Sequence, residues 1–549
     1  MVLDTMKYMR HNGEQYSFRS KIQKAGVLKA IIAVFLAAFI LAPLVRMFFY
    51  IGRDSINNVI TSPLTGTAIK NSLVSSAIAT AITMVLAYTT AYAIERSNMK
   101  GRNFFSIVFV VPMLIPSISH GMGILLVLGN NGLLRKLLNL KFSIYGLPGI
   151  LLGSVLYAFP IAFLMLSDVM KYEDSSPYEA AQVLGVDRLH QFTAITFPYI
   201  RKPIITIVFA IFTVIITDYG VPLMVGGTYT TIAIVLYQEV IGRLNFGTGV
   251  LYGIFLLIPA VIAFIIDLNN NDSGNSSFVT KAFTSTNSRL RKCVGYIICS
   301  AVAAIILLLV ISFVQLGFTG SYSNSTLFTL AYFKEARNYH LGKYLLNSVI
   351  IAAAAAFAGM SIALATAYLT TRMESKASRA LHLLAITSAA IPGIVLGLSY
   401  ILTFKNTALY GTLFLLMLVN TIHFFSSPYL MMYNSLSKLN ENLEGVGFTL
   451  GISRGQLIRD IIIPQCKGTL VEMFIYFFVN CMITISAVSF LATSVTKPVS
   501  LMITQFEAQM KLECAAIVSL CILIVNICAK AAAYYLKNRE FKTTKLKHL

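Results

Sequence analysis

The chain alternates long apolar stretches with short polar segments. Runs of about 20 mainly apolar residues, the length at which a helix crosses about 30 Å of hydrocarbon, recur before and after a polar stretch at 269–292. The predicted spans are 27–49, 70–93, 104–128, 148–168, 203–226 and 248–267, then 294–317, 346–369, 380–403, 412–433, 468–491 and 514–536. We therefore expect an all-α integral membrane protein with about 12 transmembrane helices.

The two sets of spans are copies of one another. Asn71 recurs as Asn347 and Arg96 as Arg372, both displaced by 276 positions. Beyond the third span the displacement falls to 266, which one shorter connecting segment in the second set explains. Because each set has an even number of spans, the copies cross in the same direction, as parallel repeats. We predict a first repeat at 1–268, a cytoplasmic linker at 269–292 and a second repeat at 293–549.

A polar loop, 176–198, joins the fourth and fifth predicted spans and carries the signals of two short helices. Ser176 can cap the first helix, with Glu179 reaching back to the cap. Gly185 can end that helix, because glycine adopts the left-handed conformation without a Cβ clash. Asp187 can cap a second helix, which we expect Pro198 to stop. The loop should form a helix, a sharp turn and a helix.

A spaced copy of this loop lies at 440–464, between the corresponding spans of the second repeat. Ser453 and Gln456 form the capping box of its second helix. Three positions keep their spacing in both copies: Gly185, Ile195 and Pro198 in the first, and Gly451, Ile461 and Pro464 in the second. The repeated helical loop is thus the main candidate functional element.

These loops resemble the signature loop of binding-protein-dependent ABC import permeases: Glu-Ala-Ala, three residues, Gly, nine residues, Ile, one residue, an apolar residue and Pro. The first copy matches it with Glu179, Ala180, Ala181, Gly185, Ile195 and Pro198, and has Phe197 where leucine is usual. The resemblance implies a type I ABC importer permease-like fold. It also implies that each loop couples the chain to one of two cytoplasmic ATP-binding subunits, and that an extracytoplasmic solute-binding protein delivers the solute.

The second copy departs from this pattern. Gly445, Val446 and Gly447 stand where the Glu-Ala-Ala would be, and Glu444 lies one place early. Glycine and valine lower helix propensity, so this sequence predicts a less stable first helix in the second loop. We expect the two loops to bind their partners unequally, with changes at Glu179 or Gly185 more harmful than the same changes at Glu444 or Gly451.

Composition and charge agree with a membrane protein. Apolar residues make up 57% of the chain and charged residues 12%, and the mean hydropathy is +0.75. The net charge of +21 does not indicate nucleic acid, because the basic residues are spread among short loops without stacking aromatics. Most of the 43 Lys and Arg fall in alternate loops, so the positive-inside rule predicts that both termini and both motif loops face the cytoplasm. The resemblance implies that the membrane is a bacterial inner membrane.

The sequence itself carries little chemistry. It has no G-x-x-x-x-G-K-[ST] phosphate loop and no clustering of His, Cys, Asp and Glu suited to catalysis or a metal, so we expect no cofactor and no enzymatic activity. The resemblance implies that the partner subunits hydrolyse ATP. Asp218 lies deep in the fifth predicted span, where a carboxylate is costly and indicates either solute contact or the capping of backbone groups freed by Gly220 and Pro222.

Two further interpretations concern the solute and the transport class. The segments TDYGVPLMVGGTYTTIAIVLYQEVIG and TISAVSFL are similar to fused permeases of the ferric-iron and 2-aminoethylphosphonate group, which makes either compound an expected solute. A secondary transporter of the six-plus-six kind is the alternative, since it is also a parallel repeat. Its expected Gly- and Asp-Arg-containing loop between spans two and three is not matched here by IERSNMKGR.

Overall fold

The computed structural model describes residues 26–130, 132–139, 141–270, 289–319, 328–373, 375–440 and 442–547, and the regular structure of these residues is helical throughout. Most of the predicted linker, 271–288, lies outside them. The first repeat contains a helix at Gly26–Phe48 (ending in η2, Ala37–Leu41, and α3, Ala42–Phe48), α4 (Arg53–Thr61), α5 (Pro63–Arg96), α6 (Arg102–Val110), η3 (Val111–Leu114), α7 (Ser117–Leu128), α8 (Leu133–Leu137), α9 (Leu147–Lys171), α10 (Ser176–Val183), α11 (Arg188–Gln191), η4 (Phe192–Thr196), α12 (Phe197–Ile216), α13 (Gly220–Val225), α14 (Ile232–Tyr237), η5 (Gln238–Gly242) and α15 (Phe246–Asn270).

The second repeat follows a similar course. It contains α16 (Arg289–Thr319), α17 (Ala331–Asn338), α18 (Leu341–Thr371), α19 (Lys376–Thr387), η6 (Ser388–Ala390), α20 (Gly393–Phe404), α21 (Leu413–His423), α22 (Ser426–Ser437), α23 (Leu443–Thr449), α24 (Arg454–Leu457), η7 (Ile458–Ile462), α25 (Ile463–Gln465), α26 (Lys467–Ile483), α27 (Ser500–Ala508) and α28 (Leu512–Lys547). Within its described residues it has no counterpart of α8 or α13, and α21 and α22 take the place of α9.

The predicted spans are present, but four of them are bent. Eight helices of the described residues are long and apolar enough to cross a membrane, and four bent pairs bring the number to 12. The third span of each repeat turns by 107° or 105° where Pro116 or Pro392 follows a 3₁₀ turn. Proline cannot donate the next helical hydrogen bond, which favours a break of the helix at this point. The sequence prediction of about 12 spans is confirmed.

The fifth spans begin earlier and end earlier than predicted. α12 ends at Ile216, and Thr217 to Tyr219 form a bend before the short α13. At the other end, Pro198 does not stop the preceding helix, as we had expected: the helix runs unbroken from Leu189 to Ile216. The reason is local, because Pro198 follows the π-helical η4 and occupies the first turn of α12, where its missing N–H costs little.

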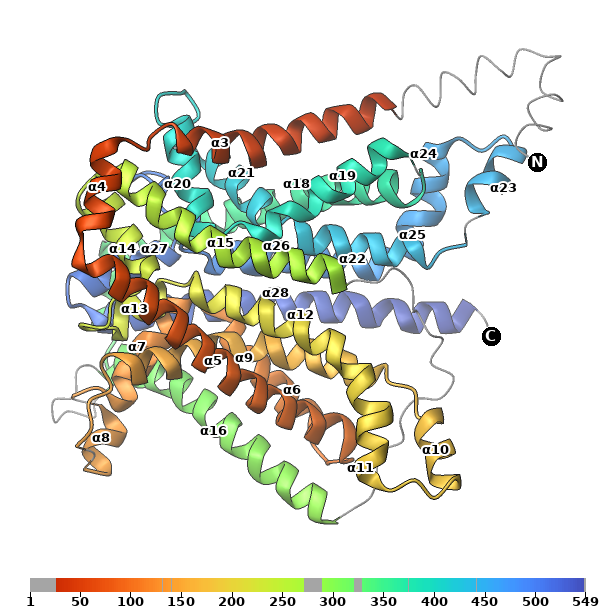
Figure 1. Ribbon diagram of the computed structural model, residues 1–549, viewed down its shortest axis with the longest axis horizontal. Coiled ribbons are helices and arrows are strands. Elements are labelled where there is room, and N and C mark those ends of the chain that lie inside the picture. Colours follow the sequence, from red (N-terminus) through yellow and green to blue (C-terminus); the bar gives the residue numbers. More distant parts are fainter. Residues whose placement is uncertain are drawn as a thin grey trace.

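The first helix of each repeat packs against the other repeat (Figure 1). Helix Gly26–Phe48 lies beside α20, where Tyr400 donates a hydrogen bond to the Phe39 carbonyl at 2.8 Å. At its start, Lys29 Nζ donates to the Met373 carbonyl at 2.7 Å and to Ser378 Oγ at 2.7 Å. Reciprocally, α16 packs along α5, α6 and α7. Each repeat therefore packs against the other through its first helix.

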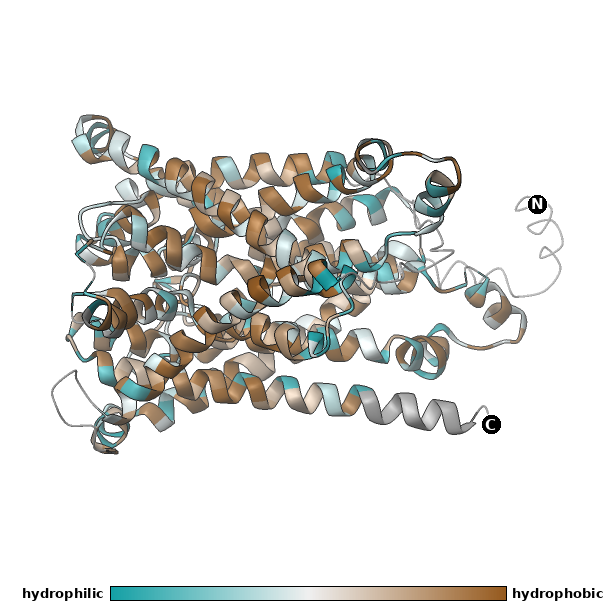
Figure 2. Ribbon diagram, turned by 90° about the horizontal axis from the view of Figure 1, so that it is seen from below, coloured by the Kyte–Doolittle hydropathy of each residue, from teal (hydrophilic) through white to brown (hydrophobic). Residues whose placement is uncertain are grey.

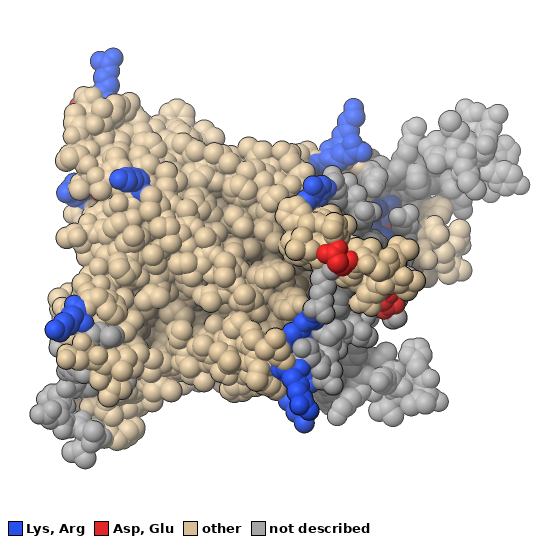
Figure 3. All heavy atoms as spheres, turned by 60° about the horizontal axis from the view of Figure 1, so that its bottom comes forward, with Lys and Arg blue, Asp and Glu red and all other residues tan. Residues whose placement is uncertain are grey.

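The surface is divided into an apolar belt and two charged ends. Apolar residues dominate the middle of the helices in Figure 2, and Figure 3 shows Lys and Arg gathered toward the two ends of the molecule with a nearly uncharged surface between them. This is the surface expected of a bundle surrounded by lipid. We call the end that carries α10, α11, α23 and α24 the loop end (Figure 1).

Candidate functional site

The two repeated loops project beyond the apolar belt at the loop end. In Figure 1 the first loop, α10 and α11, and the second, α23 and α24, lie toward opposite edges of this end, and the C-terminal end of α28 projects at the same end. The sequence prediction placed both loops on one side of the membrane, and the fold provides that arrangement. Which side faces the cytoplasm stays a prediction.

Both loops turn through the same backbone motif. In the first, Gly185 has φ +70°, Val186 N donates to the Ala181 carbonyl at 2.9 Å, and Gly185 N donates to the Gln182 carbonyl at 3.1 Å. The second loop repeats this pattern with Gly451 at φ +71°. These paired bonds form a Schellman motif, which requires a left-handed residue just past the helix end. The sequence therefore specifies the turn correctly in both copies.

The N-terminal caps of the loop helices follow the prediction in two places and depart from it in one. Asp187 Oδ2 accepts from Leu189 N at 3.3 Å, and the capping box of Ser453 and Gln456 is complete. Ser176, however, does not cap α10: it is the first helical residue, and its N–H and hydroxyl both donate to Asp174, at 3.0 and 2.8 Å. Asp174, two residues earlier in the chain, therefore accepts the first backbone N–H of α10.

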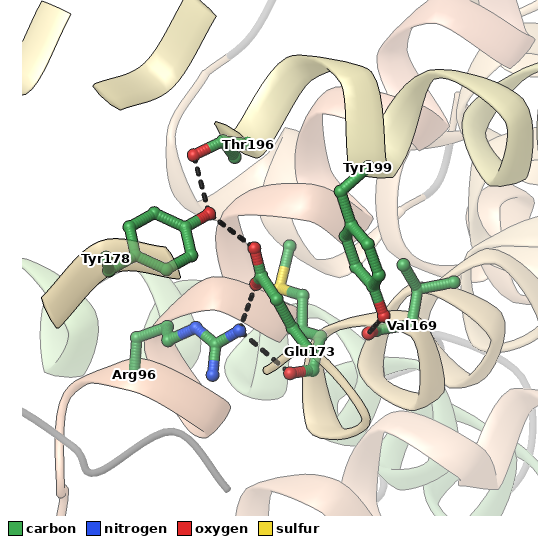
Figure 4. Close-up of polar contacts among 7 residues, drawn as sticks. Arg96, Val169, Glu173, Tyr178, Thr196 and Tyr199 are labelled. Atoms are coloured by element: carbon green, nitrogen blue, oxygen red, sulfur yellow. Dashed lines mark hydrogen bonds and ion pairs between the residues drawn. The ribbon is translucent and has the colours of Figure 1, made fainter. Parts of the chain in front are cut away.

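A buried ion pair fixes the first loop to the membrane helices (Figure 4). Arg96, the last residue of α5, pairs with Glu173, which follows α9, and also donates to the Met170 carbonyl at 2.8 Å. Only 7% of each of the two paired side chains is exposed. Charges buried to this degree need a partner and additional hydrogen bonds, since desolvation is costly. The pair therefore locks the end of α5 to the start of the loop.

Tyr178 extends this network into α10. Its hydroxyl donates to the second Glu173 oxygen, and Thr196 Oγ1 lies 2.7 Å from the same hydroxyl (Figure 4). Burial, and then the hydrogen bond to Glu173, raise the pKa of Tyr178 above its usual value, so the phenol keeps its proton and donates. One network therefore joins α5, the segment after α9, α10 and η4.

The second loop is anchored by a different ion pair. Arg372, at the position equivalent to Arg96, holds both oxygens of Glu444, with Nε–Oε1 at 2.8 Å and Nη2–Oε2 at 2.6 Å. It also donates to the carbonyls of Leu439 and Asn440. A two-point arginine–carboxylate contact fixes orientation as well as distance. Here the arginine reaches the carboxylate of α23 directly, without an intervening tyrosine.

The acids of the predicted motif consequently play different parts. Glu179 is exposed on α10, 3.4 Å from Ser175 Oγ, whereas Glu444 is largely enclosed by Arg372. Glu444 occupies the place of Tyr178, 266 positions earlier, rather than that of Glu179. The glutamate one place early in the second copy is therefore an internal anchor. This contact also offsets the low helix propensity that the sequence predicts for α23.

One small residue in each loop is enclosed by its neighbours. Ala181 is buried, and Gly447, at the equivalent position, is so close to Leu457 that a Cβ would approach its Cδ1 to 3.3 Å. Ala180 is exposed. Of the remaining motif residues, Ile195 and Ile461 are half-buried, and Pro198 and Pro464 are exposed.

Each loop presents apolar side chains outside the belt. Val183, Leu184 and Leu189 of the first loop are 88%, 78% and 72% exposed, and Leu450 of the second is 68% exposed. Apolar side chains gathered at the tips of rigid, capped helices are a surface suited to a protein partner. The fold therefore offers two matching docking points at one end.

Asp218 lies in the bend after α12. Its carboxylate accepts from Val221 N at 3.0 Å and from Gly220 N at 3.3 Å, so it caps α13. The neighbouring Tyr219 reaches across to the other repeat, with its hydroxyl 2.6 Å from Ser489 Oγ. The geometry accounts for the carboxylate as a helix cap at the boundary of the repeats, and solute contact by Asp218 stays a prediction.

Asp218→Asn separates these two roles. An amide oxygen can still accept from the α13 backbone. We therefore expect the free energy of unfolding of the variant to lie within about 1 kcal/mol of that of the wild type. If the charge also contacts the solute, uptake should fall while assembly with partner subunits is kept. Uptake kinetics in vesicles are the measurement, and wild-type kinetics would leave Asp218 as a cap alone.

Sequence reasoning missed the anchors of both loops. Arg96 and Arg372 were recognised only as matching positions of the repeat, and Glu173 and Tyr178 were not singled out. A signal was available, because a basic residue that recurs at the end of the same span in both copies indicates a shared contact. Its partner was not predictable, since Glu173 is 77 residues away and Glu444 is 72.

Comparison with known proteins gives one consistent result. The family described as "Binding-protein-dependent transport system inner membrane component" matches the chain twice, over residues 85–271 and 357–542, and each match includes one loop. A Haemophilus influenzae protein assigned as a ferric transport system permease is 27% identical over 501 residues, 86% of this chain and 78% of that one. The ferric transport system permease protein of Actinobacillus pleuropneumoniae is 26% identical over 86% of this chain and 72% of its own. The thiamine transport system permease protein of Escherichia coli is 29% identical over 29% of this chain and 31% of its own.

Proposed function

This chain belongs to the family of binding-protein-dependent transport system inner membrane components, and from that premise we propose that it moves a small solute into the cytoplasm using ATP hydrolysed on two separate subunits. The observation that carries the proposal is the pair of matching loops at one end of the bundle. Each loop is capped, turned by a Schellman motif and tied to the spans by a buried or enclosed ion pair. Two such loops suit two ATP-binding subunits.

Rigid anchoring is what coupling requires. A force applied to α10 reaches α5 and η4 through Arg96, Glu173 and Tyr178 rather than being lost in a flexible loop. For nucleotide to drive transport, it must bind one arrangement of the helices more tightly than the other. In this structure the repeats meet at Tyr219 and Ser489, while the loops lie toward opposite edges of the loop end. We propose that nucleotide binding brings the loops together.

The solute arrives from an extracytoplasmic binding protein in this proposal. The family's description supports such a partner, and the two ferric transport permeases, which align with most of the chain, favour ferric iron as the solute. A thiamine permease is also similar over a shorter stretch, so the family fold accepts chemically different solutes. The 2-aminoethylphosphonate alternative stays a prediction from the sequence.

Reconstitution tests the transport class. The chain, its ATP-binding subunits and its binding protein would be placed in vesicles, and ferric uptake measured with and without ATP. We expect uptake to require hydrolysable ATP and to survive an ionophore that collapses ion gradients. Uptake driven by a gradient in the absence of nucleotide would instead support the secondary transporter, an alternative that the double family match disfavours.

The orientation of the loops has its own test. Because the basic residues favour the loop end as the cytoplasmic side, a cysteine at Thr193 should be labelled only after the membrane is permeabilised. A cysteine at Asn139, which is exposed in the connection before α9, should be labelled in intact cells. Cys293 and Cys528, which are exposed, would first be replaced by serine. The reverse pattern of labelling would contradict the orientation.

A further inference from the structure

An apolar groove runs along the outer face of the second repeat, between α18, α26 and α28. Its volume is about 390 Å³, and its walls include Met360, Leu470, Phe474, Phe478, Ala529 and Ala533. Phe474 and Phe478 stack with centroids 6.3 Å apart and form one wall. Alanines three or four residues apart lie on one face of a helix. The small alanine side chains of α28 therefore leave space opposite the two phenylalanines. The groove is apolar and faces the surrounding membrane.

The length and depth of the groove match one leaflet. It extends from Lys467, the first residue of α26, to Phe478, eleven residues further on, which corresponds to roughly 16 Å of helix. Half of a hydrocarbon layer of about 30 Å is about 15 Å. A single acyl chain that enters from the loop end would therefore fill the groove without leaving its own leaflet.

Two basic side chains lie at the mouth of this groove. Lys467 is exposed and lines it. Lys537, one residue beyond the lining residue Leu536, pairs with Glu472 of α26. Lys530 lies two turns before Lys537 on the same face of α28 and is half-buried. The two lysines at the mouth, Lys467 and Lys537, favour an anionic headgroup over a zwitterionic one.

The mouth of the groove also lies at the bend where the second loop meets α26, which we call the joint. The helix Arg454–Gln465 bends by 77° into α26 at Cys466, directly beside Lys467. In the first repeat the equivalent helix, Leu189–Ile216, is unbroken, and Arg201 stands in the place of Lys467. Phe264 and Thr206 replace Lys530 and Glu472 there. The charged joint is thus a feature of the second repeat.

We propose that this groove binds one acyl chain of an anionic phospholipid, whose phosphate contacts Lys467 and Lys537 and braces the joint of the second loop. The site is independent of the transported solute and of the ATP-binding subunits. It assigns a lipid ligand to the end of the molecule where the loop meets the membrane helices.

Native mass spectrometry of the full chain in mild detergent tests the proposal. The probes are phosphatidylglycerol and phosphatidylcholine, titrated separately. We expect tighter binding of phosphatidylglycerol, and about fivefold weaker binding in Lys467→Gln, the loss expected for one basic residue near a charged lipid surface. Ala533→Phe, which fills the groove, should lose the lipid as well. Arg201→Gln in the first repeat is the matched control and should bind like the wild type.

Three results would overturn the site. Equal binding of the two lipids would remove the role of charge, and wild-type affinity in both Lys467→Gln and Ala533→Phe would place the lipid elsewhere. An equal loss in Arg201→Gln would show a general surface effect rather than a site. None of these readouts depends on transport, so failure here would leave the proposed function intact.

Discussion

Arg96→Gln is expected to destabilise the first loop by roughly 3–5 kcal/mol, because it leaves Glu173 buried without its charged partner. Glu173 would also cease to orient Tyr178, so the loss should spread from the end of α5 into α10. The measurement is hydrogen exchange of the α10 amides together with thermal unfolding in detergent. If the proposed function is correct, solute-stimulated ATP hydrolysis should decrease together with the protection of the α10 amides from hydrogen exchange.

The control for this prediction is an ion pair on the surface of the other loop. Arg459 and Asp460 are paired, but their side chains are 76% and 54% exposed. Exposed pairs contribute little because water already solvates both charges. Arg459→Gln should therefore leave exchange and unfolding as in the wild type. If Arg96→Gln behaved like Arg459→Gln, the buried network would not be the anchor of the first loop.

Glu444→Lys should be the most damaging single change in the second loop. The new lysine would face Arg372, whose side chain is 5% exposed, so the anchor would become a repulsive contact. Loss of one partner of a buried pair costs roughly 3–5 kcal/mol, and a like charge adds to the cost. This expectation reverses the one drawn from the sequence, in which Glu444 was the less important acid of the two.

Glu179→Lys gives the matched comparison in the first loop. Glu179 is exposed, so the substitution should leave the unfolding temperature nearly unchanged while it alters the surface offered to a partner. We expect Glu444→Lys to lower both stability and stimulated ATP hydrolysis, and Glu179→Lys to lower hydrolysis alone. Thermal unfolding and hydrolysis would be measured on the same preparations. Equal thermal losses in the two variants would contradict the different roles assigned to the acids.

The local signals of the sequence were sufficient for the turns of the loops. Gly185 and Gly451 are fixed at positive φ, and nothing lies within 4 Å of a Cβ built at either residue. The backbone conformation therefore explains these glycines without any tertiary contact. The capping box of Ser453 and Gln456 is equally local, since both of its hydrogen bonds close within four residues. Patterns of this range are visible in a sequence because the interacting groups are neighbours in it.

Two other local signals were misleading, because adjacent residues compete with them. Pro198 was expected to end a helix, but the π-helical turn before it lets the helix continue. Ser176 was expected to cap α10, but it is the first residue of the helix, and Asp174 accepts from both its N–H and its hydroxyl. In both cases the residue type was correctly noted, and the outcome depended on which of several adjacent groups made the better hydrogen bond.

The sequence by itself determined the number of spans, the duplication and the two helical loops, because apolar length, repeated spacing and turn chemistry are written along the chain. The tertiary structure alone decided which partner each repeated arginine takes. Arg96 pairs with an acid before α10 and Arg372 with an acid inside α23, although the two arginines are equivalent in the repeat. A charge buried at the end of a span must find a counter-charge, and the packing of helices far apart in the sequence determines which carboxylate lies within reach.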